Sequence, residues 1–226
     1  MNDSITRRFK KTVFLIVLVG LFSLNVAIAG SYDDFFKAIK SDDASTIQRL
    51  LTRGFDVNTV DSQGQPGLLV ALREPSLQVA SLLIDSPQVN LNAVNTQGES
   101  PLMLAAIKGH FDLAQKMVKK GADINKTGWT PLHYAASTGQ LKMIGFLLEQ
   151  NAYIDAESPN GTTPLMMASL YASPESVQLL LDQGADPLLK NEQGLTALQF
   201  AERGKRVDAV ALLSKTIRAQ RPPGQW

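Results

Sequence analysis

Apolar residues recur along this chain as pairs of short helical stripes separated by polar turns. In the clearest pair, Leu132, Ala135 and Ala136 share one face at helical spacing. Residues 143–148 then form a second, broader apolar stripe, typical of a helix that is buried on two sides. Between them, Gly139 is placed to end the first helix, because glycine adopts the left-handed conformation at low cost. The pattern predicts a helix–turn–helix unit.

The same unit recurs with a period near 33 residues. Five glycines mark its copies at spacings of 34, 30, 33 and 33 residues: Gly64, Gly98, Gly128, Gly161 and Gly194. Thr130 and Pro131 combine a capping side chain with a residue whose missing N–H is tolerated in the first turn of a helix. Because each short unit buries its apolar face only against its neighbours, the chain is predicted to form a stack with one long surface.

These residues resemble the ankyrin repeat, whose pattern is a glycine, TPLHxAA, a second glycine, a leucine-rich helix and an exit containing Gly-Ala-Asp. The fullest copy is at residues 128–139, where Thr130, Pro131 and His133 are the structural motif residues. Other copies keep the register at Ser100-Pro101-Leu102, Thr163-Pro164-Leu165 and Thr196-Ala197-Leu198. The resemblance covers nearly all of residues 31–215. It implies an all-α ankyrin-repeat solenoid of helix-turn-helix units joined by β-hairpin-like fingers.

The repeat frame predicts the domain organisation. The end units are degenerate, as expected of capping repeats, and the interval from Asn125 to Gly128 holds two residues where other junctions hold five, which predicts a truncated finger. The expected segments are a signal peptide at 1–29, an N-terminal cap at 30–60, repeats at 61–94, 95–125, 126–157 and 158–190, a C-terminal cap at 191–215 and a flexible tail at 216–226.

The first 29 residues have the order of a secretory signal. Four basic residues precede an apolar run at 13–24, and Ala27 and Ala29 form a small-residue cleavage site. We expect cleavage after Ala29 and Sec-dependent export to the periplasm of a Gram-negative cell. The alternative is an inner-membrane anchor, because an apolar stretch of about 17 residues is at the lower limit for a membrane span. Both place the repeats in the periplasm.

Charge and composition limit the chemistry. Without residues 1–29 the chain holds 18 basic and 20 acidic residues, so nucleic-acid binding is not expected. The absence of cysteine excludes thiol nucleophiles, disulfides and cysteine metal sites. Neither His110 nor His133 belongs to a triad or a zinc-binding pattern, and the resemblance gives His133 a structural role. No catalytic residue, metal or cofactor is predicted.

The positions that the repeat leaves free are the candidate binding residues. In ankyrin arrays the partner-facing concave surface consists of the fingers, the residue after the first glycine and the two residues before the second glycine. The resemblance therefore implies a partner-binding surface that includes Trp129, Ile107, Lys108, Leu170, Tyr171, Leu195, Arg73, Glu74, Glu99 and Arg203. Several of these are apolar where the frame does not require it, which favours an interface. Alternatively, Trp129 and Leu170 pack against neighbouring repeats.

Two functions follow from these observations. The first is a non-enzymatic periplasmic module, expected to be a monomer, that holds an unidentified protein partner from the periplasm or envelope on its concave surface and stabilises or inhibits it. In this reading the membrane is contacted only through an uncleaved signal. The second is an enzyme or small-ligand-binding protein with a site between the fingers, which would need converging polar residues such as Arg73, Glu74 and Glu99.

Overall fold

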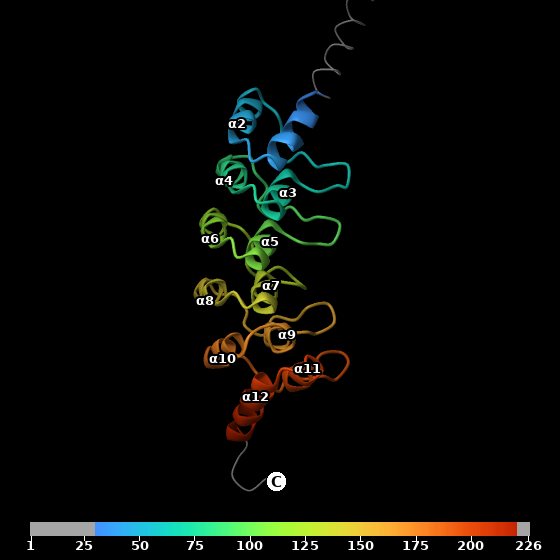
Figure 1. The fold of residues 1–226 in the computed structure, drawn as a ribbon, viewed down its shortest axis with the longest axis vertical. Helices are drawn as coiled ribbons and strands as arrows, with labels where there is room; N and C mark the ends of the chain where they lie inside the picture. The colour runs from blue at the N-terminus through green and yellow to red at the C-terminus, as the bar shows by residue number, and fades with distance from the viewer. Residues whose placement is uncertain (1–29, 221–226) are drawn as a thin grey trace, which may run out of the picture.

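The paired apolar stripes form two parallel columns of short helices in a computed structural model that describes residues 30–220 (Figure 1). The inner column contains α3 (Gly67–Arg73), α5 (Pro101–Lys108), α7 (Pro131–Thr138), α9 (Pro164–Tyr171) and α11 (Ala197–Arg203). The outer column contains α2 (Ala44–Thr52), α4 (Leu77–Asp85), α6 (Phe111–Lys119), α8 (Leu141–Glu149), α10 (Pro174–Asp182) and α12 (Val207–Gln220). Residues 30–40 are also helical and lie at the N-terminal end of the stack.

Small and branched residues of the inner helices fill the core. Leu132, Ala135 and Ala136 of α7 are fully buried, as their spacing predicts. The equivalent residues of the neighbouring helices are also fully buried: Leu102, Ala105 and Ala106 of α5, Leu165 and Ala168 of α9, and Ala201 of α11. Alanine lets consecutive inner helices approach closely, and α3, α5, α7, α9 and α11 each pack against the next. The predicted all-α solenoid is confirmed.

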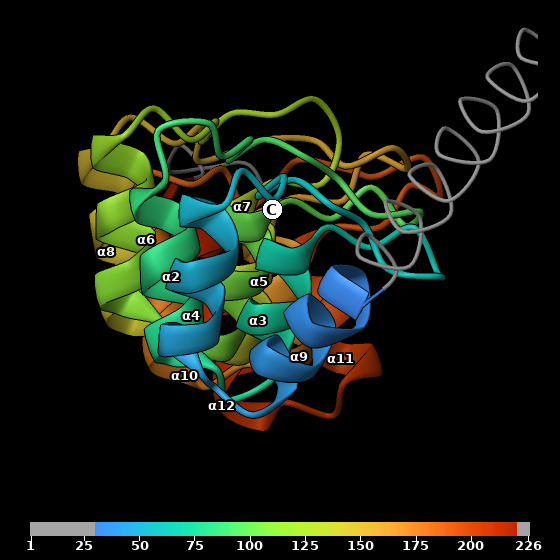
Figure 2. The same cartoon turned by 90° about the horizontal axis from the view of Figure 1, so that it is seen from above.

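Loops project from the inner column on the side away from the outer helices and form the fingers (Figures 1 and 2). In the first finger the Asp61 side chain accepts hydrogen bonds from the backbone N–H groups of Gln63 and Gln65, both at 2.9 Å. Gly64 closes the turn with φ of +74°, a conformation that favours glycine. Asn95 and Asn191 repeat this arrangement in their fingers. Among residues 30–220, the only bridge of β type joins Val60 and Pro66.

A polar side chain at the base of each finger joins one repeat to the next. The Asn92 side-chain oxygen accepts from the backbone N–H of Asp123 at 2.9 Å. Asn125 donates to the carbonyl oxygen of Asn151 and accepts from the backbone N–H of Tyr153, both at 2.8 Å. Asn58 and Asp155 make equivalent contacts with their following repeats. Because these groups pair across the repeat boundary, the fingers are held in register with the helices.

The finger that leads into α7 is shorter than its neighbours, as the spacing predicts (Figure 1). From Asn58 to Gly64 and from Asn92 to Gly98 there are six positions, but from Asn125 to Gly128 there are three. The three missing residues include the position that Asp61 and Asn95 occupy in their own fingers, where their side chains accept the hydrogen bonds of the turn.

The C-terminal end departs from the expected organisation. The helix α12 continues to Gln220, so residues 216–220 are helical rather than part of a tail that begins after residue 215. Apolar residues Leu212 and Leu213 pack in this helix, and no breaker interrupts the segment that follows them. The predicted signal peptide and residues 221–226 lie outside the described part. Within that part, no helix is long and apolar enough to cross a membrane.

Candidate partner-binding surface

The last turns of the inner helices and the fingers form one continuous side of the stack, here called the inner surface. Its centre is hollowed into a pocket of about 240 Å³, here called the central pocket. The pocket is lined by residues of three consecutive repeats: Ile107 of α5, Trp129, His133, Tyr134 and Ser137 in and before α7, and Met167 of α9. Stacking therefore brings together Ile107 and Trp129, two of the predicted site residues, 22 positions apart in the chain.

His133 anchors the central pocket to the core and is fully buried. Its Nδ1 accepts from the backbone N–H of Thr130 at 3.1 Å, and Thr130 Oγ1 lies 2.9 Å from the same nitrogen. Since Nδ1 is an acceptor there, the ring proton is on Nε2, which donates to the carbonyl oxygen of Thr162 at 2.9 Å. The ring thus caps α7 and joins it to the entry of α9. The expected structural role of Thr130 and His133 agrees with this geometry.

Burial lowers the pKa of His133 to about 4, against smaller opposing effects of the Thr162 and Ala156 carbonyls. Burial of the neutral ring therefore contributes fully to stability above pH 6.5. Between pH 6.5 and about pH 4 the unfolded chain binds a proton that the folded chain does not bind, so this contribution is lost as the pH falls through that range. We expect the free energy of unfolding to fall by about 2.5 kcal/mol between pH 7 and pH 4.5 through this residue. Urea titrations at both pH values measure the change.

The matched control for this pH dependence is His133→Gln, which keeps an acceptor but does not titrate. Carboxyl groups titrate equally in both proteins, so the difference between the two pH profiles isolates His133. Identical profiles from pH 7 to pH 4.5 would contradict the prediction.

Trp129 has both an exposed and a packed side. It is half-buried, and its ring meets the His133 ring edge-on, with centroids 5.2 Å apart and planes at 75°. Such an arrangement is favourable between aromatic rings. The remainder of the indole faces the central pocket. The two interpretations of Trp129 from the sequence are therefore not exclusive, because one side chain contacts the repeat core and also lines the inner surface.

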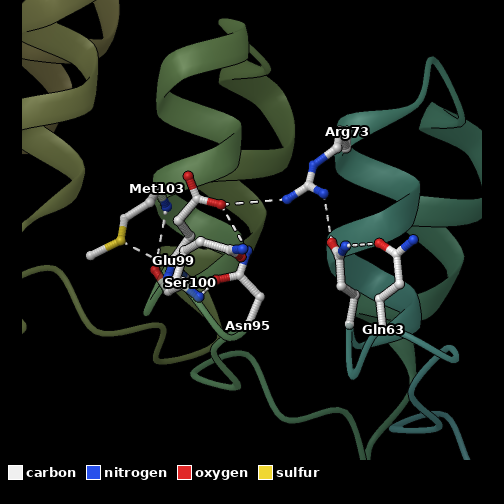
Figure 3. Close-up of polar contacts among 8 residues, drawn as sticks. Gln63, Arg73, Asn95, Glu99, Ser100 and Met103 are labelled. Atoms are coloured by element: carbon white, nitrogen blue, oxygen red, sulfur yellow. Dashed lines mark hydrogen bonds and ion pairs between the residues drawn. The ribbon is translucent and has the colours of Figure 1, made fainter.

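A charged network joins α3 to the next repeat (Figure 3), and its Glu99 carboxylate acts on the pocket residue Tyr134. Arg73 of α3 reaches across to the next repeat, where Nη2 lies 3.4 Å from the Glu99 carboxylate, and its Nη1 donates to Gln65 at 2.6 Å. Asn95 donates to the same carboxylate at 2.7 Å. Burial and then the Glu99 carboxylate raise the pKa of Tyr134, a pocket residue. The charges of Arg73 and Glu99 are thus satisfied within the network.

The other predicted site residues differ in solvent exposure. Glu74, Lys108, Tyr171 and Arg203 are exposed, and Tyr171 retains 59% of its accessible surface. Leu170 and Leu195 are half-buried. Leu170 lies against the following repeat, since a Cβ at Gly204 would come within 3.2 Å of its side chain. Tyr171 is therefore the predicted aromatic residue with the most surface available to a partner.

Sequence reasoning missed two pocket residues, Tyr134 and Met167. Both occupy the variable position of the TPLHxAA pattern, which the sequence analysis treated as unassigned. The equivalent positions hold Val70, Leu104 and Phe200, so this column is apolar in all five units. Val70 and Leu104 are buried, whereas Tyr134, Met167 and Phe200 are half-buried. A uniformly apolar column at a position that the motif leaves open is the signal that could have identified them.

Candidate metal ligands are not clustered among residues 30–220. No group of three or more histidine, aspartate or glutamate side chains is placed to hold a metal ion there. Arg73 and Glu99, which the alternative of a site between the fingers would use, are paired with each other. The central pocket is lined mainly by apolar side chains. The arrangement is suited to contact with an apolar side chain or surface.

Comparison with known proteins gives the same fold. The family model described as Ankyrin repeats (3 copies) matches residues 35–127, 87–158, 125–191 and 155–221. The chain is 33% identical over 122 residues to mouse Ankyrin repeat and SAM domain-containing protein 6, which is 52% of this chain and 14% of that protein. It is 30% identical over 176 residues to human Transient receptor potential cation channel subfamily A member 1, which is 74% of this chain and 16% of that protein. The chain spans only about a sixth or less of these relatives.

Two solved bacterial structures are similar over most of their length. One is a chain in the structure of the Bd0816 predatory endopeptidase of Bdellovibrio bacteriovorus in complex with immunity protein Bd3460, with a TM-score of 0.70, 28% identity, and 80% and 97% of the two chains covered. The other is an ankyrin repeat domain of Acinetobacter baumannii, with a TM-score of 0.69, 26% identity, and coverage of 80% and 96%. Ankyrin repeats are a protein–protein interaction module. This chain belongs to the ankyrin-repeat family.

Proposed function

We propose that this protein is a non-enzymatic binding module that holds a folded protein partner on its inner surface in the periplasm. The observation that carries the proposal is a set of apolar side chains on that surface at positions where the repeat motif does not require an apolar residue. Trp129, Tyr134 and Met167 line the central pocket, and Tyr171 is exposed at the end of α9, the helix that carries Met167. Aromatic side chains around a pocket are common centres of binding energy in protein interfaces.

The rigidity of the stack supports the same function. The side chains of the inner surface are carried by helices whose apolar residues are fully buried. Their fingers are tied to the next repeat through groups such as Asn92 and Asn125. Binding a partner on such a surface orders few additional groups, so less conformational entropy is lost.

The solved-structure resemblance supports a partner that is itself an enzyme. One similar chain comes from a complex between a predatory endopeptidase and an immunity protein. An array of the same shape can, by analogy, hold an envelope enzyme and restrain or stabilise it. This analogy concerns the class of partner and does not name the partner protein, because the two chains are only 28% identical in sequence.

Location in the periplasm rests on the order of residues 1–29, with basic, apolar and small-residue segments in succession. Expression of the full chain in a Gram-negative host, osmotic-shock fractionation and N-terminal sequencing test this part of the proposal. We expect a periplasmic product that begins at Gly30. A product that keeps residues 1–29 and sediments with the membrane fraction would support the anchored alternative.

Tyr171→Ala is expected to abolish partner capture while changing the free energy of unfolding by less than about 0.5 kcal/mol, because the side chain is mostly exposed. Affinity capture with the tagged protein from a periplasmic extract, followed by mass spectrometry, measures binding. The matched control is Tyr153→Ala, since Tyr153 is also exposed, at 67%, but lies in the loop after α8. Capture should survive that change.

Trp129→Ala should affect both properties because the ring is shared between core and pocket. We expect the free energy of unfolding to fall by about 1–2 kcal/mol as the edge-on contact with His133 is lost, together with loss of capture. Failure of the unaltered protein to capture any stoichiometric protein, with turnover or binding of a small molecule instead, would contradict the proposed function.

A further inference from the structure

We propose that the central pocket receives one apolar side chain from an acidic segment of the partner, and that a carboxylate of this segment meets Lys108. This inference rests on the proposed function and specifies the chemistry of the partner. Three observations carry it: the size and lining of the pocket, the shortened finger beside it, and the charges along the ends of the inner helices.

The dimensions of the central pocket fit a single side chain. Its volume of about 240 Å³ is below the range of about 300–1,000 Å³ typical of small-molecule sites. Its walls are the apolar parts of Ile107, Trp129, Tyr134 and Met167, and these come from three successive repeats. An apolar side chain placed there would be removed from water on several sides, which is the usual environment of an interface anchor.

The shortened finger leaves access to the central pocket. Gly128 ends this finger, and Trp129 follows it directly. The fingers around Asp61, Asn95 and Ser158 each carry three further residues at this place. Less of the chain therefore projects beside Trp129 than beside the equivalent residues of other repeats, as the short loop next to α7 illustrates (Figure 1).

The end of one inner helix supplies an unpaired cation beside this opening. The last residues of α3, α5, α7, α9 and α11 are Arg73, Lys108, Thr138, Tyr171 and Arg203. Within residues 30–220, Lys108 and Arg203 form no ion pair, whereas Arg73 is paired with Glu99. Glu202, the single acidic residue of these five helices, lies beside Arg203 on α11, two units away from α7, and Glu74 follows Arg73 at the end of α3, also two units away. Lys108 is therefore the charged helix end nearest to α7.

Lys108 is the cation best placed to act with the pocket. It is exposed and follows Ile107, a pocket residue, directly in the chain. A carboxylate next to an anchored side chain could therefore reach its ammonium group, which would add charge complementarity to the apolar contact. A lysine at the end of a helix also interacts favourably with the helix dipole. Lys119 is also the last residue of its helix, α6, but α6 belongs to the outer column. It is therefore the control residue for Lys108.

The test uses three blocked pentapeptides as probes for the protein produced from the full chain: acetyl-Asp-Glu-Leu-Glu-Asp-amide, its serine analogue, and acetyl-Lys-Lys-Leu-Lys-Lys-amide. Two-dimensional NMR follows the Trp129 indole N–H signal during each titration. We expect the acidic leucine peptide to shift this signal and to bind about tenfold more tightly than the serine analogue, since a leucine side chain is removed from water. The basic peptide should bind at least about threefold more weakly than the acidic leucine peptide.

Charge and shape variants separate the two parts of the inference. Lys108→Glu should weaken the acidic leucine peptide by at least about threefold and strengthen the basic one, whereas Lys119→Glu should leave both unchanged. Ser137→Leu places an aliphatic side chain at the pocket wall, so the preference for leucine over serine should disappear. Ser137 is half-buried, and a thermal melt checks that this variant remains folded.

The outcomes distinguish this inference from the proposed function. If the acidic and basic peptides bind equally, or if none shifts the Trp129 signal, the inference is wrong even when Tyr171-dependent capture of a protein succeeds. If the peptides behave as expected but no protein is captured, the pocket chemistry stands and the proposed function fails. Retention of the leucine preference in Ser137→Leu would place the apolar contact outside the central pocket.

Discussion

Replacing His133 with alanine is expected to lower the free energy of unfolding by about 4 kcal/mol. The imidazole is fully buried, so its removal leaves a cavity in the centre of the stack. It also leaves the Thr130 N–H without its acceptor and the Thr162 carbonyl without its donor. Both residues are almost fully buried, so water does not replace these bonds readily.

The loss should also uncouple the two halves of the array. His133 joins α7 to the entry of α9, and in a repeat protein stability depends on contacts between neighbours. Chemical denaturation measures the total change, and hydrogen exchange of α7 and α9 amides locates it. A change below about 1 kcal/mol with unaltered exchange would show that the two hydrogen bonds contribute little.

Two matched variants give the control for His133→Ala. His133→Gln should recover part of the stability, because the equivalent Gln199 accepts from the backbone N–H of Thr196 at 2.8 Å. His110→Ala should cost less, because His110 is half-buried and its Nε2 lies 3.2 Å from a single carbonyl, that of Leu72. The expected order of stability loss is therefore His133→Ala, then His133→Gln and His110→Ala.

Replacing Gly67 with valine is expected to lower the free energy of unfolding by about 3 kcal/mol through overpacking. Gly67 begins α3 where other repeats have proline or alanine, and an added Cβ would come within 2.6 Å of the Phe35 ring. That ring cannot move away easily, since it is fully buried and packs against Phe36 and Phe55 with centroids 5.2 and 4.8 Å apart. The N-terminal capping repeat should detach first.

Gly145→Val is the matched control for Gly67→Val. Gly145 lies within α8, and apart from its chain neighbours and the backbone of its own helix, no atom is within 4 Å of an added Cβ. We expect its replacement to leave the free energy of unfolding within about 0.5 kcal/mol of the original or to raise it slightly, since valine has a better helix propensity than glycine. Denaturant midpoints compare the two variants, and hydrogen exchange of residues 30–52 tests the detachment. Equal effects at both glycines would contradict the packing argument.

Local sequence patterns predicted the frame because each repeat specifies its own turns. All five periodic glycines have positive φ between 73° and 83°, and Asn151, which replaces a glycine, has φ of +64°. The capping positions of Thr130 and Thr163 begin α7 and α9 where the motif places them. The C-terminal boundary was less well predicted. The last unit lacks the Gly-Ala-Asp exit that follows the outer helix of other repeats, and propensity alone did not locate the end of α12 at Gln220.

The candidate site could be predicted only in part, because its members touch across repeats. The free positions after each glycine and before the second glycine included Ile107 and Trp129, which line the central pocket, and Arg73 and Glu99, which pair beside it. The same reasoning did not include Tyr134 and Met167. Nor could it foresee that Arg73 and Glu99 pair with each other, since their distance depends on the rise and rotation between α3 and α5.

The sequence by itself determined the repeat, its register, the truncated finger and the positions of apolar residues that the repeat motif does not require. These properties are local, since a helix stripe, a cap or a left-handed glycine is fixed within one unit of about 33 residues. Only the tertiary structure decided that Ile107, Trp129 and Met167 enclose one pocket and that Trp129 also supports His133. The physical reason is that close packing between repeats sets these contacts, and packing depends on the geometry of neighbouring units rather than on the spacing within one.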